Sequence, residues 1–221
     1  MTDPMLRSWC EVSQTAIEAN VRVLRRRLSP TAKLGVVVKS NAYGHGILLC
    51  AKAFLNAGVD WLIVNSLGEV EALREGDVEA PIYLCVQPAP FEADRVVKSG
   101  ARIALCSLEV ATAIAASAQR QDRVVRCHIK VETGTNRQGV LGDELTDLVQ
   151  LAGQLDGLIL EGLTTHFADV EDTTDHSFAE GQIEALATAV STVREQGIEV
   201  PMVHAANSAA TLMWPETHVD L

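Results

Sequence analysis

The sequence predicts an α/β fold, a (β/α)8 TIM-like barrel that is incomplete at its eighth strand. Short apolar runs alternate with helical patterns along the chain, as expected of parallel strands joined by helical crossovers. Seven such units and the opening of an eighth follow one another. The competing layout is an open doubly wound sheet, which is disfavoured because no G-x-G-x-x-G pattern follows the first strand.

Hydrophobic periodicity and helix caps define the expected elements. Ser13 is the candidate N-cap of a first helix with apolar residues at helical spacing from Ala16 to Leu24. The apolar runs expected to form strands are 34–38, 61–64, 82–86, 102–106, 124–131, 158–165, 202–205 and, opening the eighth, 218–221. The expected helices are 13–28, 46–57, 67–74, 90–99, 108–119, 142–153, 175–196 and 208–213.

Composition limits the classes of function. A chain of 221 residues that is 48% apolar suits one domain with a full core. The net charge is −11 and the only basic run, Arg25–Arg27, is expected on a solvated face, so nucleic acid binding is not expected. Five cysteines without C-x-x-C spacing indicate reduced thiols in a cytoplasmic protein and no metal site. No apolar run approaches ~18 residues and no signal core is visible, so neither membrane insertion nor secretion is expected.

The run V-V-V-K-S-N-A-Y-G-H-G, from Val36 to Gly46, carries the most chemical information. Three valines lead directly to Lys39, and a polar turn with glycines follows. This order places an amine at the carboxyl end of a buried strand, where functional residues of barrels collect. Loss of water there lowers the pKa of a lysine and makes it a nucleophile toward carbonyls, so a Schiff base to an aldehyde cofactor is expected.

This run resembles the cofactor-lysine segment of the alanine racemases, pyridoxal-phosphate enzymes built on a β/α barrel. The resemblance extends over essentially all of this chain but only about 60% of a complete racemase, in which a C-terminal β domain follows the barrel. It implies that residues 1–221 are a pyridoxal-phosphate-binding barrel domain, a fragment that lacks the C-terminal β domain. It also implies that Lys39 holds the cofactor and moves the α-proton of the substrate.

Arg137 lies just past the fifth expected strand, in E-T-G-T-N-R-Q-G. This segment is similar to the racemase segment D-T-G-M-G-R-x-G, whose arginine hydrogen-bonds the phenolic oxygen of the cofactor. Glu132 and Thr135-Asn136 depart from that pattern and leave the loop shape open. Lys130 matches a lysine that is carbamylated in many racemases and holds the arginine. A lysine paired with a neighbouring acid is an equal alternative.

The remaining site residues also follow strands and are expected to meet at one rim. His166 matches the racemase histidine that supports the second catalytic base. Asn207 and Ser208 match the Asn-Ser pair that binds the cofactor phosphate, with a plain N-cap as the alternative for Ser208. Tyr43 matches the family tyrosine that also reaches the phosphate. Val37 packs either near the cofactor or only in the core.

The implied function is pyridoxal-phosphate-dependent racemisation of an amino acid, with alanine as the expected substrate and D-alanine for peptidoglycan as the product. Racemases take a second base, a tyrosine, from the C-terminal domain of the partner subunit, and neither Tyr43 nor Tyr83 matches it. A homodimer is therefore implied for the full-length protein, and this chain alone is expected to bind cofactor weakly and to racemise poorly or not at all. We interpret His128, His204 and His218 as structural.

Three other functions fit parts of the sequence. A single-domain pyridoxal-phosphate-binding or homeostasis protein without racemase activity has a comparable length but lacks the N-A-Y-G-H-G string. A basic amino acid decarboxylase carries a different lysine motif. A Schiff-base aldolase without cofactor would not need phosphate donors after the seventh strand. Within the racemases, serine, lysine or a broad range of amino acids stay open as substrates, because one methylene changes binding by only ~1–3 kcal/mol.

Overall fold

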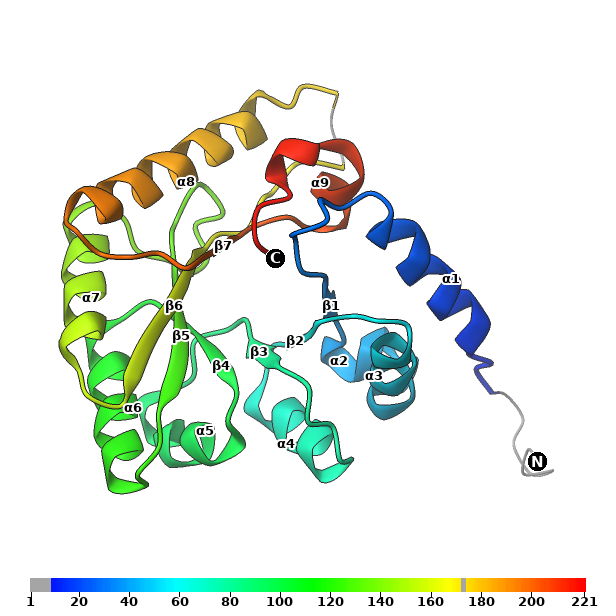
Figure 1. The fold of residues 1–221 in the computed structure, drawn as a ribbon, viewed down its shortest axis with the longest axis horizontal. Helices are drawn as coiled ribbons and strands as arrows, with labels where there is room; N and C mark the ends of the chain where they lie inside the picture. The colour runs from blue at the N-terminus through cyan, green and yellow to red at the C-terminus, as the bar shows by residue number, and fades with distance from the viewer. Residues whose placement is uncertain (1–8, 172–173) are drawn as a thin grey trace.

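The computed structural model describes residues 9–171 and 174–221. In this part of the chain, seven parallel strands form one sheet in sequential order (Figure 1). The strands are β1 (Gly35–Val37), β2 (Trp61–Val64), β3 (Ile82–Leu84), β4 (Arg102–Leu105), β5 (Val125–Lys130), β6 (Leu158–Thr164) and β7 (Met202–His204). The predicted α/β architecture with parallel strands is confirmed.

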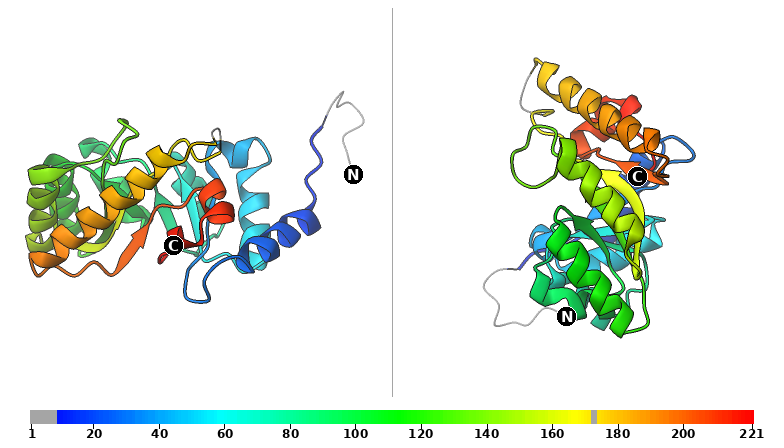
Figure 2. Two further views of the ribbon diagram at one scale, coloured as in Figure 1. Left: turned by 90° about the horizontal axis from the view of Figure 1, so that it is seen from above. Right: turned by 90° about the vertical axis from the view of Figure 1, so that its left-hand side faces the viewer.

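Helices connect the strands and cover the outside of the curled sheet, and α1 lies at the end of the molecule opposite α6 and α7 (Figures 1 and 2). They are α1 (Gln14–Arg25), α2 (Lys39–Tyr43), α3 (Ile47–Asn56), α4 (Leu67–Glu75), α5 (Ala93–Ser99), α6 (Leu108–Arg120), α7 (Gly142–Gln154), α8 (Ser177–Glu195) and α9 (Ser208–Met213), with 3-10 turns η1 (Pro90–Glu92) and η2 (Pro215–Thr217). Ser13 caps α1 as expected, its side chain accepting the Ala16 N–H at 3.2 Å.

The predicted eighth strand is not formed by residues 218–221. Asp220 nevertheless joins β7 to the chain that leads into β1. Its N–H donates to Val203 O at 3.1 Å, and its carbonyl accepts the Lys33 N–H at 2.9 Å. Its carboxylate also accepts the Val203 N–H at 2.8 Å. Residues 218–221 thus occupy the place of a closing strand, but one bridging residue does not supply the repeated ladder bonds that define a strand.

Two further predictions are wrong in detail. The expected helix at 90–99 is divided into η1 and α5, whereas the polar turn predicted after β1 is present as the short left-handed segment α2. Of the run Arg25–Arg27, Arg26 and Arg27 are exposed as expected, but Arg25 is partly buried: it pairs with the carboxylate of Asp60 at 2.5 Å and donates to Gly58 O at 2.7 Å. The guanidinium therefore ties the end of α1 to the segment that enters β2.

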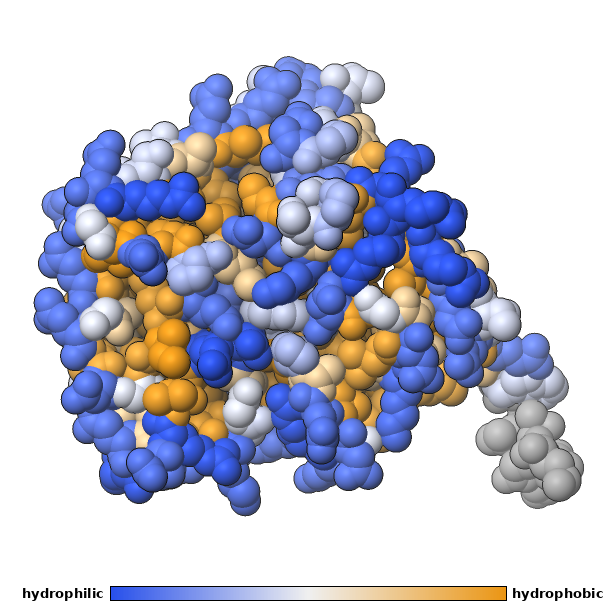
Figure 3. Space-filling model, viewed as in Figure 1, coloured by the Kyte–Doolittle hydropathy of each residue, from blue (hydrophilic) through white to orange (hydrophobic). Residues whose placement is uncertain are grey.

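The apolar side chains form a large core between the sheet and its outer helices and a smaller one inside the curl. The inner cluster contains Trp61, Tyr83, Ala104 and Met202, from four different strands, with Leu221 packed against it. Packed side chains thus fill the barrel interior. Figure 3 shows hydrophilic side chains along the outline of one face, with hydrophobic surface between them. Among the described helices, none is long and apolar enough to cross a bilayer.

Candidate active site

The backbone directly after Lys39 is left-handed. Ser40, Asn41, Ala42 and Tyr43 have φ values of 53°, 56°, 53° and 54°. This conformation costs roughly 1–2 kcal/mol for each residue that is not glycine, asparagine being the most tolerant. Such strain persists only where the surroundings fix it, and it gathers at functional sites. The segment is therefore built to give the preceding lysine one particular position.

Side chains of the turn itself supply part of this support. Asn41 Oδ1 accepts the Ile47 N–H at 2.8 Å, which connects the turn to the start of α3. His45 Nδ1 donates to Ala42 O at 2.8 Å, closing the turn from the other side. No chemical role is expected for His45 from the sequence, and this contact provides a structural one.

Lys39 is half-buried, and no carboxylate of the described residues lies within ion-pair distance of its amine. The enclosure that we expected around Lys39 is thus incomplete in this chain. Its neighbours Val37 and Tyr43 are 38% and 62% exposed. Val37 is therefore not a core residue, which leaves the alternative in which it packs near a ligand. The arrangement places a half-buried lysine just past the carboxyl end of β1.

The loop of residues 131–140 carries Arg137 on its exposed side. The carboxylate of Glu132 lies inside this loop and accepts N–H groups from residues 134–137. Partial burial raises the pKa of Glu132, but these N–H groups outweigh it and hold the pKa below its usual value. Gly139, with φ +151°, packs so closely that a Cβ there would lie 2.6 Å from Glu132 N. Glutamate in place of the usual aspartate thus still organises the arginine loop.

Lys130, the last residue of β5, is only 6% exposed. Burial lowers the pKa of its amine, and Arg137 nearby lowers it further. The thiols of Cys85 and Cys106 also lie close, and burial raises the pKa of Cys106 to about 11, so that it stays protonated. No carboxylate of the described residues pairs with Lys130, so the salt-bridge alternative is not found there.

His166 follows β6 and is half-buried. Burial lowers the pKa of its imidazole, and the cations Lys130, Arg137 and Lys39 lower it further, in that order. The ring is therefore neutral at neutral pH. These electrostatic effects also place the four side chains at the same end of the barrel, the end formed by the carboxyl ends of the strands, which we call the mouth. The structure therefore brings Lys39, Arg137 and His166 together at one end of the barrel.

A glutamine that was not predicted from the sequence connects the loop of residues 131–140 to the segment that follows β6. Gln182, on α8, is 1% exposed. Its Nε2 donates to Thr133 Oγ1 and to His166 O, each at 3.1 Å, and its Oε1 accepts the Ala168 N–H at 2.8 Å. Thr133 also bonds the Thr165 hydroxyl at 2.7 Å. The signal in the sequence is a polar residue on the apolar stripe of a helix, formed here by Ala179, Leu186, Val190 and Val193.

Asn207 and Ser208 differ in their contacts at the start of α9. Asn207 is the N-cap of α9, because its Oδ1 accepts the Ala210 N–H at 2.9 Å. Its Nδ2 also donates to Phe167 O at 3.4 Å, which fixes α9 against the segment after His166. Ser208 is the exposed first residue of the helix, and its hydroxyl has no hydrogen-bond partner among the described residues. The cap alternative for Ser208 is wrong, and its hydroxyl is free to bind a ligand.

The histidines interpreted as structural are held by intramolecular bonds. His128 Nδ1 and His204 Nε2 lie 3.0 Å apart inside the barrel, and His218 Nε2 donates to Thr211 O at 2.8 Å. Tyr83 is buried in the middle of β3, and its ring packs edge-on beside both barrel histidines. Within residues 9–171 and 174–221, no group of three acidic, histidine or cysteine side chains could hold a metal ion. The mouth is thus suited to an anionic ligand with an electrophilic carbon, for which it offers amines, a guanidinium and a free hydroxyl.

The family model described as alanine racemase, N-terminal domain, matches residues 12–221 of this chain. The alanine racemase of Symbiobacterium thermophilum is 36% identical over 219 residues, which are 99% of this chain and 58% of that protein. The alanine racemase of Synechocystis sp. is 35% identical over 216 residues, 97% of this chain and 58% of that protein.

Solved structures agree with this family. Alanine racemase from D-cycloserine-producing Streptomyces lavendulae superposes with a TM-score of 0.87 at 30% identity, covering 94% of this chain and 55% of that one. The Bacillus anthracis alanine racemase with bound L-Ala-P superposes with a TM-score of 0.92 at 28% identity, covering 99% and 56%. The chain thus spans less than two thirds of the length of these relatives. Because the family model covers nearly all of it, the chain belongs to the alanine racemase family and corresponds to the N-terminal domain.

Proposed function

We propose that this chain is the cofactor-binding part of an enzyme that interconverts L- and D-alanine with pyridoxal phosphate. The observation that carries the proposal is Lys39: a half-buried lysine with no carboxylate partner among the described residues, set on a strained turn at the mouth. Membership of the alanine racemase family supports it. The alternative of a homeostasis protein without racemase activity is not favoured, because the relatives and solved structures named above are racemases.

The donors at the mouth fit the proposed cofactor. Pyridoxal phosphate, when bound, supplies an aldehyde that condenses with an amine and a conjugated ring that takes up electrons from the α-carbon of an amino acid. Lys39 Nζ is the amine. The exposed guanidinium of Arg137 is a permanent donor for a phenolic oxygen. The free hydroxyl of Ser208 and the exposed Tyr43 are donors for phosphate, while Asn207 contributes by holding the start of α9.

In this proposal Lys39 also removes or returns the α-proton on one side of the substrate. An amine takes up a proton only in its neutral form, and it must lie within hydrogen-bond reach of that proton. The strained turn that sets the position of Lys39 serves this second condition. His166 is neutral at neutral pH, so it can accept or donate a hydrogen bond without adding charge. It serves as support for the base on the other side.

For Lys130 we propose carbamylation. A buried amine beside a guanidinium, with no carboxylate paired to it among the described residues, gains most by reacting with carbon dioxide. The Nζ–carbon bond forms as one amine proton leaves, and the resulting carbamate is an anion. An anion there would attract Arg137 where the free cation repels it. The modification would therefore steady the arginine at the mouth.

Several features of the whole enzyme belong to the proposal as well. The second base, a tyrosine, and the dimer contact that supplies it come from a further domain, in a homodimer of the full-length protein. We also propose a cytoplasmic location and a role in supplying D-alanine for the peptidoglycan of the cell wall. Residues 1–221 alone should racemise alanine poorly or not at all.

The decisive experiment compares Lys39→Ala with Lys52→Ala, an exposed lysine on the neighbouring α3. Borohydride reduction after incubation with pyridoxal phosphate, followed by peptide mass spectrometry, measures covalent loading. Loading at Lys39 is expected in the unchanged chain and in Lys52→Ala, and none in Lys39→Ala. An unchanged chain that traps no cofactor at Lys39 overturns the proposal. D-alanine formation by the full-length protein then tests the reaction itself.

A further inference from the structure

The strained turn after Lys39 is supported by a residue from a different part of the chain. Glu69, in the first turn of α4, accepts the Ser40 N–H with its Oε1 at 2.5 Å. The other oxygen of the same carboxylate accepts the N–H groups of Asn65 and Ser66 at 3.1 and 3.2 Å. One carboxylate thus joins the left-handed turn to the end of β2.

Glu69 is itself firmly held. It belongs to a capping box with Ser66, whose Oγ accepts the Glu69 N–H at 3.3 Å. Its helix packs into the main core through Leu67, Val70 and Leu73. The helix dipole also favours a carboxylate at a helix N-terminus. The support is therefore anchored on a rigid element.

Lys39 lies between two fixed peptide groups. On one side, Val38 O, in the peptide before Lys39, accepts the Ala42 N–H at 2.9 Å, and the Val38 N–H donates to Ile63 O in β2 at 2.8 Å. On the other side, the Ser40 N–H is held by Glu69. Since a left-handed turn of non-glycine residues returns to ordinary backbone angles when it is released, loss of the second contact would let the peptide after Lys39 rotate. The direction of the lysine side chain would change with it.

We infer that Glu69 is a positioning residue that fixes the left-handed turn and thereby aims Lys39 at the carbonyl carbon it must attack. Glu69 touches neither substrate nor cofactor in this role and acts only through the Ser40 peptide. The inference rests on the proposed function for its chemical consequence, but the contact itself can be tested without any cofactor.

The first measurement is hydrogen exchange at the Ser40 amide in the cofactor-free chain. Glu69→Ala removes the acceptor, so exchange at Ser40 should accelerate by about tenfold, the effect of one hydrogen bond to a charged group. Glu69→Gln keeps an oxygen acceptor and should recover most of the protection. Glu92→Ala is the matched control, because Glu92 accepts the Ala89 N–H at 2.9 Å at the start of η1, in the next βα unit.

The second measurement separates aiming from binding. Covalent loading of Lys39 with pyridoxal phosphate is measured by borohydride trapping. Affinity for pyridoxine 5′-phosphate, which has the same ring and phosphate but no aldehyde, measures binding alone. Glu69→Ala should lower the affinity for pyridoxal phosphate, which depends on the covalent bond, by about tenfold. It should change the affinity for pyridoxine 5′-phosphate by less than about twofold. Glu92→Ala should leave both unchanged.

The outcomes distinguish the two proposals. If Ser40 exchange in Glu69→Ala equals that of the unchanged chain, or if both affinities fall equally, the positioning role is wrong. Failure of Glu69→Gln to recover loading also contradicts it. If Ser40 exchange accelerates as expected but the unchanged chain traps no cofactor at Lys39, the contact stands and the proposed function fails.

Discussion

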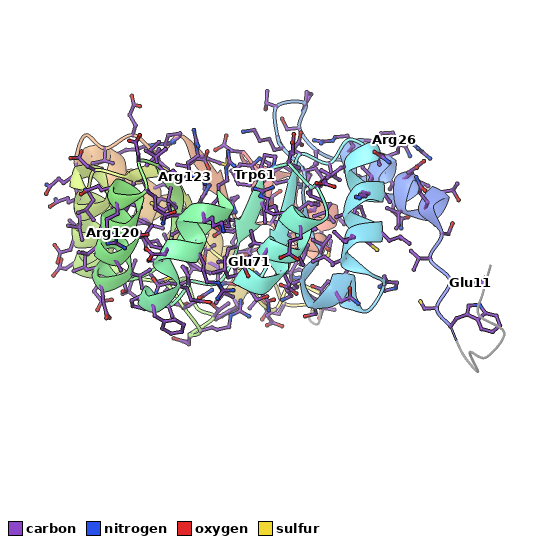
Figure 4. The ribbon with its side chains drawn as sticks, turned by 90° about the horizontal axis from the view of Figure 1, so that it is seen from below. Glu11, Arg26, Trp61, Glu71, Arg120 and Arg123 are labelled. Carbon is purple, nitrogen blue, oxygen red and sulfur yellow. The ribbon has the colours of Figure 1, made fainter. Side chains whose placement is uncertain are left out.

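The two ends of the barrel differ in how their charged side chains are paired. At the end where the strands begin, Glu161 accepts hydrogen bonds from Arg102 Nε at 2.7 Å and Nη2 at 3.3 Å, and it pairs with Arg126 at 3.3 Å. Arg102 also lies over the ring of Trp61, 4.4 Å from its centroid. Figure 4 shows this end along one edge of the molecule, where Arg26, Trp61 and Arg123 are labelled.

The pairing continues into the barrel interior. His128 Nε2 bonds Glu161 at 3.0 Å, His204 Nε2 lies 3.0 Å from the other ring nitrogen of His128, and the Thr164 hydroxyl lies 3.1 Å from His204 Nδ1. The ionised carboxylate of Glu161 can only accept hydrogen bonds, so His128 carries its proton on Nε2. His204 then donates from its Nε2 to Nδ1 of His128. Each buried polar group in this chain of contacts has a partner.

At the mouth the same residue types stand without such partners. Lys39, Lys130 and Arg137 form no ion pair within the described residues, although Lys130 is buried. Breaking a buried charge pair destabilises a fold, whereas like charges held close together favour the binding of an anion. A buried lysine without an ion pair, Lys130, beside the exposed guanidinium of Arg137 is therefore what marks the candidate site.

The largest expected effect comes from breaking the paired end. Glu161→Leu leaves Arg102 and His128 without their acceptor, so the free energy of unfolding should fall by about 3 kcal/mol. Urea unfolding measures it. Glu184→Leu, at an exposed position on α8, is the control and should change the value by less than about 0.5 kcal/mol. A loss of less than about 0.5 kcal/mol in Glu161→Leu would show that the network contributes nothing to the free energy of unfolding.

The second largest effect is expected at Gln182, which joins the loop of residues 131–140 to the segment that follows β6. Gln182→Leu leaves the Ala168 N–H and His166 O without partners in a buried place, and the free energy of unfolding should fall by about 2 kcal/mol. Gln119→Leu removes one exposed bond to Asp156 O and should cost less than about 0.5 kcal/mol. Equal losses in the two variants would contradict the role assigned to Gln182.

The buried histidines predict how stability depends on pH. Burial holds the pKa of His204 well below its usual value, and burial also lowers that of His128. As the pH falls, these histidines take up protons in the unfolded chain but not in the folded chain. Their contribution to the free energy of unfolding is therefore fully present above pH ~6.5 and is lost below it. The expected loss from His204 is about 1.4 kcal/mol per pH unit between pH ~6 and ~5. Urea unfolding at several pH values should show this slope, and His204→Gln should reduce it. An unchanged slope in His204→Gln would contradict the attribution of the pH dependence to His204.

The smallest expected effect is a gain. Lys130→Met removes a buried amine whose lowered pKa shows that folding disfavours its charge, and the free energy of unfolding at neutral pH should rise by about 1 kcal/mol. Lys98→Met, at an exposed position on α5, should have no effect beyond about 0.5 kcal/mol. The gain should shrink in bicarbonate buffer if Lys130 becomes a carbamate. A loss of stability in carbonate-free buffer would show that the amine is better paired than we conclude.

Local patterns predicted most of the architecture. The strands were recognised because each is a short apolar run between polar turns, and the parallel order follows once helices alternate with them. The end of the barrel that carries Lys39, Arg137 and His166 was also predictable, because each of them lies in the segment that follows a strand. The expected strand at 218–221 failed because a strand is defined by its neighbours, and only Asp220 bridges to both sides.

Contacts between distant segments could not be read in the same way. Ser66 and Glu69 have the spacing of a capping box, but nothing in that spacing shows that the carboxylate reaches Ser40, 29 residues earlier. Likewise, the polar position of Gln182 in an apolar stripe indicates a buried hydrogen bond but not its partners, Thr133 and His166. The left-handed turn was missed because three of its four residues have no intrinsic preference for that conformation.

The sequence by itself determined the alternation of strands and helices and the position of one lysine at the end of the first strand. Periodicity and turn residues act over a few neighbours, and a linear pattern contains that information. Only the tertiary structure decided which charges are paired and which stand free, and which backbone strain is supported. Those properties depend on atoms brought together by the curling of the sheet, at separations that no local pattern encodes.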